Sequence, residues 1–340
     1  KPGIPFMGER YTNDGNYIAQ IDGLQARTRE RIYNRLASGK IALEEVACPC
    51  GGKEFLLLSE KERFGLPVKI VMCKRCGIIL QSPRMAQEGF DDFYSGDFSD
   101  LAFNINAVSP EDYFFWRKKD GPPVIHEYLK DILTADSHLL EIGCGAGGIL
   151  DYFRQIGCKV TGIDLDENYI SYGRSLGLDL YCCHTRDFIS NESRKFDIVI
   201  LAHVLEHFLD IEKELSDIKK LIMPGGYLYV ELPGIKGFSL EYHQFDFLNS
   251  LQLAHTYYFD RDTFVQMMSW YGFRCVKSNE YISGLFQIDE SVAKRRENHS
   301  ADLLRFLTYL ETHRKSLQKG VFAQETQMKE EAGNGNALGN

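Results

Sequence analysis

The stretch HLLEIGCGAGGIL, residues 138–150, constrains the fold of this chain more than any other part of the sequence. An apolar run leads into four glycines, Gly143, Gly145, Gly147 and Gly148, and a helical pattern follows them. Glycines let the backbone approach a ligand closely, and the start of a helix presents free N–H groups. The stretch therefore predicts a strand, a ligand-binding loop and a helix in succession; a tight turn without a ligand is the alternative.

Similar units follow this one along the chain. The apolar runs KVTGIDL, FDIVILA and GYLYVELP come after HLLEIG, and helical stretches such as IEKELSDIKKLIM separate them. Buried strands alternating with helices predict an α/β fold with a parallel sheet and right-handed crossovers. GFRCVKSNEYISGLFQI offers two β-rich runs and predicts a closing hairpin, whereas DYFFWRKKDGPPVIHEYLKDIL predicts a helical entry segment interrupted at residues 121–123.

The residues around the glycine loop bear on its ligand. Gly143, Gly145 and Gly148 satisfy the dinucleotide pattern G-x-G-x-x-G, so a nicotinamide cofactor is one interpretation. Glu141 lies two residues before Gly143, where a carboxylate suits a cationic ligand and would repel a pyrophosphate. Asp164 ends the next apolar run, about 20 residues on, where an acid can bind ribose hydroxyls in either case.

Four segments together extend this pattern: LLEIGCGAGG, GIDLD, FDIVILAHVLEH and LIMPGGYLYVELP. In these segments the chain, over residues 113–290, resembles the class I S-adenosylmethionine (SAM)-dependent methyltransferases. The resemblance implies an α/β fold with a Rossmann-like seven-stranded sheet in which one strand is antiparallel. It also implies SAM as the cofactor, with its methionine part at the glycine loop.

The resemblance assigns cofactor contacts residue by residue. Gly143, Gly145 and Gly147 would line the methionine and the ribose, Asp164 would bind both ribose hydroxyls, and Leu165 would touch the adenine. The other cofactor-binding residues that we expect are Glu141, Cys144, His203 and Arg117.

Two of these cofactor assignments leave alternatives open. Arg117 ends the aromatic segment DYFFWR, which is either an amphipathic helix packed on the sheet or a lid whose arginine meets the methionine carboxylate. The family often has an acid after the third strand, and here His184 stands near that place, with Asp187 three residues further on.

Four cysteines gather in the first quarter of the chain. ACPCGG and VMCKRCGI place Cys48, Cys50, Cys73 and Cys76 in two pairs, and a glycine after each pair permits a tight turn. Four thiolates can close a tetrahedral Zn²⁺ site, so we predict a zinc ribbon. A redox-active Cys73–Cys76 pair is the alternative. The other cysteines fall in apolar runs or the glycine loop, where they fill the core.

A ribbon before this type of core is similar to that of bacterial methyltransferases of polysaccharide and deoxysugar pathways, some of which methylate carbon in 4-keto sugars. LPVKIVMCKRCGIILQSPRM and DFLNSLQLAHTYYFDRDTFVQMMSWYGF carry this resemblance. It implies a nucleotide-linked or polymeric sugar as the acceptor and a ribbon that acts as a lid or clamp on the substrate side.

Candidate catalytic residues follow the fourth and fifth apolar runs. His255 is the expected base, with Tyr258 beside it, and Tyr242 and His243 are the nearest substitutes. Ala254 and Gln252 depart from the Y-x-E-H-x-x-Y-F pattern of the sugar C-methyltransferases. His207 and Glu231 complete the expected catalytic set.

Charge and composition limit the partners. The formal net charge is −9 and the chain has no Lys/Arg-rich stripe, which disfavours nucleic acid. No apolar run approaches the roughly 20 residues of a membrane span, and the segment KPGIPFMGERYTND lacks a signal-peptide core. With nine unevenly spaced cysteines, we expect a cytoplasmic enzyme with a small-molecule or carbohydrate substrate.

We expect four segments: an N-terminal helical segment (1–47), a zinc-ribbon domain (48–105), a methyltransferase domain (106–290), and a C-terminal helix with a disordered tail (291–340). The predicted activity is base-assisted, in-line methyl transfer to a sugar. The alternatives are an RNA or other small-molecule methyltransferase and a non-catalytic SAM-binding module.

Overall fold

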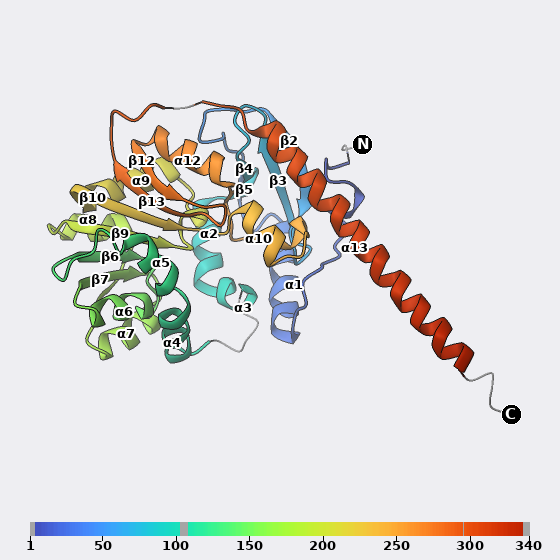
Figure 1. Ribbon diagram of the computed structural model, residues 1–340, viewed down its shortest axis with the longest axis horizontal. Helices are drawn as coiled ribbons and strands as arrows, with labels where there is room; N and C mark the ends of the chain where they lie inside the picture. Colours follow the sequence, from blue (N-terminus) through green and yellow to red (C-terminus); the bar gives the residue numbers. More distant parts are fainter. Residues whose placement is uncertain (1–3, 103–107, 295, 336–340) are drawn as a thin grey trace.

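Two larger β-sheets, each with its own helices, dominate the computed structural model, which describes residues 4–102, 108–294 and 296–335 (Figure 1). The strands of the larger sheet are β6 (His138–Ile142), β7 (Lys159–Asp164), β8 (Asp179–Cys182), β9 (Phe196–Ala202), β10 (Ile222–Glu231), β12 (Phe273–Ser278) and β13 (Ser283–Ile288).

The larger sheet has the strand order β12-β13-β10-β9-β6-β7-β8. Strand β13 is antiparallel to both of its neighbours, and the other adjacent pairs are parallel. The expected α/β fold, with seven strands of which one is antiparallel, is therefore confirmed. The predicted hairpin is β12–β13, with its turn at residues 279–282.

Helices cover both faces of this sheet, as the alternation of its buried residues requires. On β9, Ile198 and Ile200 pack on one side, while Val199 and Leu201 pack on the other. The first face meets α4 (Pro110–Asp120), α5 (Pro122–Leu129), α6 (Gly148–Gln155) and α7 (Glu167–Ser175). The second face meets α8 (Thr185–Asn191), α9 (Ile211–Leu221) and α12 (Arg261–Trp270).

The smaller sheet is antiparallel, with the order β11-β4-β3-β2. Three of its strands come from the N-terminal part: β2 (Phe55–Lys61), β3 (Pro67–Cys73) and β4 (Ile79–Gln81). The fourth, β11 (Tyr257–Tyr258), follows β10 in the chain. After β10 the chain therefore leaves the larger sheet, adds β11 to the smaller sheet, and returns to the larger sheet at β12.

Short elements surround the smaller sheet. They are η1 (Glu9–Tyr11), α1 (Gly23–Ala37), the β1–β5 ribbon (Leu43–Glu44 with Arg84–Met85), α2 (Gln87–Asp92), the π-helical turn η2 (Phe93–Asp97) and α3 (Phe98–Ala102). Three further short helices, η3 (Leu205–His207), α10 (Ile235–Glu241) and α11 (Phe247–Ser250), lie in the segments between β9 and β11.

The last helix, α13 (Ser300–Gly335), lies against the smaller sheet and runs away from the molecule toward the C-terminus (Figure 1). Leu303, Leu307 and Leu310 bury one side of it in the core around the smaller sheet. We call residues 4–102, which contain most of this sheet, the N-terminal half. Among the described residues, every helix is too short or too polar to pass through a lipid bilayer.

Some expectations need correction. In the predicted N-terminal helical segment (1–47), α1 ends at Ala37, because Gly39 takes a left-handed φ of 70°. Within the predicted zinc-ribbon domain (48–105), residues 87–102 form the three short helices α2, η2 and α3. The expected disordered tail is helical over residues 330–335, and residues 336–340 lie outside the described residues. The predicted boundary at residue 105 also lies outside them, and the four predicted segments stay a prediction.

Candidate active site and metal centre

The glycine loop joins β6 to α6 through three left-handed residues. Gly143, Gly145 and Gly147 have φ values of 74°, 53° and 83°, which side chains with a Cβ rarely adopt. The space is also closed: a Cβ on Gly143 would lie 2.4 Å from Cγ2 of Val204, and one on Gly145 would lie 2.4 Å from Cε1 of Tyr113. Both geometry and packing therefore require glycine here.

Asp164, at the end of β7, is tied to this loop. Its Oδ2 accepts a hydrogen bond from the Gly145 N–H at 2.7 Å, and its Oδ1 accepts one from the Asp166 N–H at 2.9 Å. Burial raises the pKa of Asp164, against these hydrogen bonds. The next side chain, Leu165, is exposed. The predicted ribose-binding acid and adenine contact thus lie beside the glycine loop.

Glu141 lies beneath the loop on β6 and is buried. Among the described residues, its Oε2 has no hydrogen-bond partner. Burial raises the pKa of Glu141 to about 8, and the charge of Arg117 on α4 opposes this shift. Cys144 is buried next to it, with Sγ 3.5 Å from the Gly145 carbonyl oxygen. A buried carboxylate with an open oxygen is suited to a cationic ligand.

Helix α4 brings Arg117 and Tyr113 to this region. The Arg117 guanidinium lies 5.7 Å from the ring centre of Trp116. The ring of Tyr113 covers Gly145 and stands 4.7 Å from that of Tyr169. The DYFFWR segment is part of a helix packed on the sheet, and it also brings Arg117 and the ring of Tyr113 to the glycine loop. A packed helix and a lid, its two predicted roles, are therefore compatible.

A second group of polar side chains stands where β9 and β10 end. His203 has a left-handed φ of 61°, which is uncommon outside glycine and typical of functional positions. Its Nε2 lies 3.1 Å from Oε1 of Glu231, and its Nδ1 lies 3.8 Å from Oε1 of Glu206. Burial alone would lower the pKa of His203, but the two carboxylates raise it to about 9.

Glu206, His207 and His255 form a compact cluster next to that pair, with one potential ligand atom from each lying within 4.8 Å of the others. The rings of His207 and His255 meet edge to face at 5.0 Å. Burial alone would raise the pKa of Glu206, but His203, His207 and His255 lower it to about 2. Burial, together with His207, lowers the pKa of His255 to about 3, which keeps this imidazole neutral.

The N-terminal half holds the loop that carries His255. Nε2 of Gln81, at the end of β4, donates to the carbonyl oxygens of Gln252, Leu253 and His255 at 3.0, 2.9 and 2.7 Å. Tyr258 closes the same loop, since its hydroxyl donates to the Gln252 carbonyl at 2.8 Å. The expected partner of His255 therefore has a positioning role in this arrangement.

The remaining catalytic candidates lie elsewhere. Tyr242 is exposed at the end of α10, where its ring stacks on Phe238 at 4.9 Å. His243 is half-buried, and burial lowers its pKa. The structure therefore brings His203, His207, Glu231 and His255 together, and neither Tyr242 nor His243 is part of the Glu206–His207–His255 cluster.

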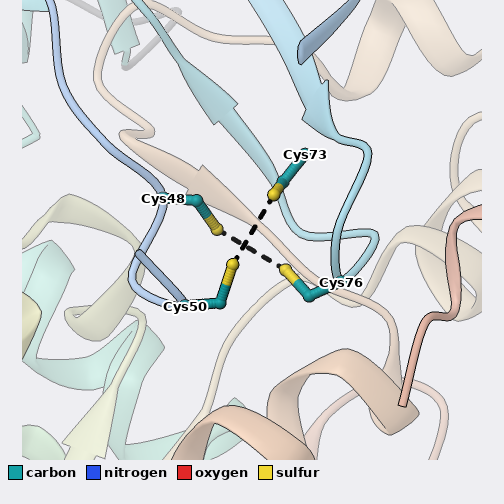
Figure 2. A group of neighbouring side chains, drawn as sticks. All are labelled: Cys48, Cys50, Cys73 and Cys76. Atoms are coloured by element: carbon teal, nitrogen blue, oxygen red, sulfur yellow. Dashed lines mark hydrogen bonds between the residues drawn. The ribbon is translucent and has the colours of Figure 1, made fainter. Parts of the chain in front are cut away.

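Figure 2 shows the four N-terminal cysteines pointing toward one centre. Cys48 and Cys76 have their sulfurs 3.5 Å apart, and Cys50 and Cys73 have theirs 3.6 Å apart. In a tetrahedral site with Zn–S bonds of about 2.3 Å, the sulfurs are roughly 3.8 Å apart, so the donors fit Zn²⁺. A Cβ on Gly52 would lie 2.7 Å from the Cys73 sulfur, which explains the glycine after the first pair.

Several contacts had no signal in the sequence. Tyr94 comes from η2, and its hydroxyl lies 2.6 Å from Nδ1 of His207, 113 positions away. Gln81 and Tyr113 are likewise distant in sequence from the loops that they contact. Glu206 is the exception, because it lies between two histidines in the segment HVLEH, and this local pattern could indicate a polar cluster.

A cavity of about 300 Å³ lies apart from the glycine loop. It is lined by residues of the smaller sheet and its surroundings, among them Glu60, Lys69 and Arg84. Gln81 and Leu253 also line it, so it adjoins the loop that holds His255.

Comparison with known proteins agrees with this geometry. Residues 116–278 match the family model described as a methyltransferase domain. The ubiquinone biosynthesis O-methyltransferase of Coxiella burnetii is 29% identical over 114 residues, which cover 32% of this chain and 48% of that protein. The protein of the same name from Brucella anthropi is 31% identical over 97 residues, covering 27% and 39%.

Among solved structures, the 1,6-didemethyltoxoflavin-N1-methyltransferase of Burkholderia thailandensis, with 1,6-didemethyltoxoflavin and S-adenosylhomocysteine bound, is 15% identical. Its TM-score is 0.43, over 64% of this chain and 93% of that chain.

Residues 116–278 are thus similar to a methyltransferase domain, and the seven-stranded sheet and the glycine loop agree with that similarity. The matched region begins inside α4 and ends with β12, so the four cysteines, the smaller sheet's β2–β4 and α13 lie outside it. The chain spans about half the length of the Coxiella burnetii relative.

Proposed function

We propose that the protein is an enzyme that transfers a methyl group from SAM to a small, oxygen-rich molecule. The observation that carries the proposal is the glycine loop, with Asp164 beside it and Glu141 beneath it, inside the matched domain. In methyl transfer, the acceptor loses a proton and bonds to the methyl carbon, while the carbon–sulfur bond breaks and its electron pair neutralises the sulfonium.

The residues around the loop would divide the binding of SAM. Asp164 would take the ribose hydroxyls, and Leu165 would cover the adenine. Glu141 would offer a negative charge to the cationic methionine end, and Arg117 would meet the methionine carboxylate. Tyr113 would have to pack on the bound molecule or move from Gly145, because its ring occupies the space above the loop.

Binding tests this proposal directly. Calorimetric titration with SAM should give one site per chain, and Asp164→Asn should weaken binding at least about tenfold, the loss of one charge-assisted hydrogen bond. Asp136→Asn is the matched control, because Asp136 is exposed in the turn before β6, at the opposite end of that strand from the glycine loop. Equal affinity in both variants, or tighter binding of NADH than of SAM, would contradict the assignment.

We propose a sugar, nucleotide-linked or polymeric, as the acceptor. The resemblance of both halves to sugar-modifying methyltransferases supports this choice. An aromatic hydroxyl is the rival, because the named curated relatives are ubiquinone O-methyltransferases. Methyl-labelled SAM with a panel of nucleotide sugars, their 4-keto forms and phenolic acceptors, followed by mass spectrometry, separates the two. Label only on phenols would exclude the sugar, and label on no acceptor would favour a non-catalytic SAM-binding module.

We propose the Glu231 carboxylate as the proton acceptor in place of His255, because its partner His203, with a pKa raised to about 9, already holds a proton near neutral pH. The Glu231 side chain is 19% exposed, whereas His255 is 7% exposed and packs against His207. General bases contribute about 10²–10⁴-fold to a rate. Glu231→Gln should therefore reduce kcat by about that factor with SAM binding retained, and His255→Gln would do so instead if His255 were the base.

We also propose that Cys48, Cys50, Cys73 and Cys76 bind a structural Zn²⁺, and that this half clamps the acceptor side of the site. Gln81 supports the clamp, since it links the strand after the cysteines to the loop of His255. Variants of the cysteines that lose zinc yet keep the wild-type KM for the acceptor would contradict the clamp.

A further inference from the structure

The Glu206–His207–His255 cluster has the composition and spacing of a second metal site. A carboxylate oxygen and two imidazole nitrogens lie within 4.8 Å of one another. Oε1 of Glu206 and Nε2 of His207 are 3.9 Å apart. Ligand atoms about 2.1 Å from a tetrahedral metal ion are separated by roughly 3.4 Å, so small side-chain rotations would close the site.

Glu206 is the first reason to expect a cation there. It is 1% exposed, and among the residues that the structure describes neither of its oxygens has a hydrogen-bond partner. Nδ1 of His203 and Nε2 of His207 are 3.8 and 3.9 Å from its Oε1, beyond hydrogen-bonding distance. His203 stands beside Glu206 without a hydrogen bond, so both buried oxygens are open to a cation that bonds to them directly.

The tautomer of His207 is the second reason. Its Nδ1 lies 2.9 Å from the carbonyl oxygen of Ala254, which can only accept, and 2.6 Å from the Tyr94 hydroxyl, which can also accept, so the two contacts favour a proton on this nitrogen. In the neutral ring, Nε2 then presents a lone pair toward Glu206. A lone pair and a carboxylate repel each other unless a cation stands between them. A backbone carbonyl on the far nitrogen is also the usual support of a metal-bound histidine.

The third reason is rigidity. The Thr256 N–H donates to the Glu206 carbonyl oxygen at 2.8 Å, and His207 holds Ala254, so bonds on both sides fix His255 against the 206–207 turn. Gln81 holds the same loop from β4. Hydrogen bonds of the surrounding backbone and of Gln81 therefore hold the three side chains together, as a binding site requires.

From this geometry we infer that Glu206, His207 and His255 bind a divalent cation of the borderline class, such as Zn²⁺, Co²⁺ or Ni²⁺. Two imidazoles and one carboxylate suit these ions and leave coordination positions open. Val204, in the same segment, touches Gly143, so the ion would lie on the cofactor side of the sheet. An oxygen of the acceptor would take an open position; this role rests on the proposed function, whereas binding of the ion does not.

Cobalt titration tests the inference on the full-length protein in the absence of SAM. Protein freed of metal by a chelator under reducing conditions should bind two Co²⁺ ions. One gives the intense thiolate-to-cobalt charge transfer of four cysteines, and the other gives only the weaker visible bands of nitrogen and oxygen ligands. A wild-type protein that binds one Co²⁺, with thiolate bands alone, overturns the proposal.

Variants locate the second ion. Glu206→Gln and His255→Gln should each lower its affinity about 10- to 100-fold or more and leave the thiolate bands unchanged. His126→Gln, on α5, is the matched control and should bind both ions. Should Glu206→Gln fail to fold, His255→Gln gives the answer. Retention of the second ion by the folded variants would place it elsewhere. Loss of SAM binding would refute the proposed function and leave the cobalt result standing.

Discussion

At the scale of single residues, the site depends on groups that are poorly satisfied in the free protein. Glu141 keeps a proton up to a pH of about 8 because burial disfavours its charge. A cationic ligand reverses that preference, since an ionised Glu141 then has a partner. The residue therefore links SAM binding to pH.

Glu141 should make SAM affinity depend on pH. The folded-state pKa is raised to about 8 from 4.5, so ionising Glu141 in the free protein becomes easier as pH rises toward 8. We expect SAM affinity to increase up to about tenfold per pH unit below that value and to level above it. In Glu141→Gln this slope should vanish in calorimetric titrations across the same range, and any slope common to both proteins belongs to SAM.

Gly145 should tolerate no side chain. Gly145→Ala adds the strain of a left-handed φ, about 1–2 kcal/mol, and a Cβ contact with Tyr113. Gly225→Ala is its control, because φ is 84° there and nothing lies within 4 Å of the added atom. Chemical denaturation should show a larger loss of unfolding free energy for Gly145→Ala, and SAM binding should weaken only in that variant. Equal losses of unfolding free energy in the two variants would mean that the Tyr113 ring moves away from the added Cβ at little cost.

At the scale of elements, what the sequence could predict depended on sequence distance. The strands, the glycine loop and Asp164 follow from local patterns of apolar residues and glycines, and the structure has the strands where they were expected. The contact of His207 with the loop of His255 spans 47 positions, and that of Gln81 with His255 spans 174. Such contacts depend on how the two sheets pack against each other, and the spacing of apolar residues within one segment carries no information about that packing.

Gln81 should matter for catalysis although it is not at the glycine loop. Gln81→Ala removes three hydrogen bonds to the 252–255 loop, so we expect a loss of about 1–3 kcal/mol of stability. The acceptor KM should rise and kcat should fall while SAM affinity stays. Steady-state kinetics with the acceptor that the labelling experiment identifies would measure this, with Gln87→Ala, on α2, as the control. Unchanged kinetics would show that β11 alone holds the loop.

At the scale of the whole molecule, the cysteine site and the larger sheet share one core. Cys48, Cys73 and Cys76 pack in the same buried cluster as Val199 and Leu228. The two halves are therefore coupled through side-chain packing as well as through β11.

Removing metal from the cysteine site should destabilise both halves together. Cys73→Ser is expected to lower Tm by several degrees or more, since structural Zn²⁺ contributes directly to folding, and the protein should melt in one transition. Cys275→Ser, outside the cluster, is the control. Calorimetry showing two transitions, with only one of them shifted, would contradict the coupling.

Strand β11 has a consequence for biosynthesis. Strands β2–β4 of the smaller sheet are translated before the larger sheet, yet their edge partner is made only at residues 257–258, and α13 covers the smaller sheet later still. Until then β4 keeps an open edge, which invites pairing with other chains. The half that is translated first is thus the half completed last, and a nascent chain halted before residue 257 would expose the hydrogen-bonding edge of β4.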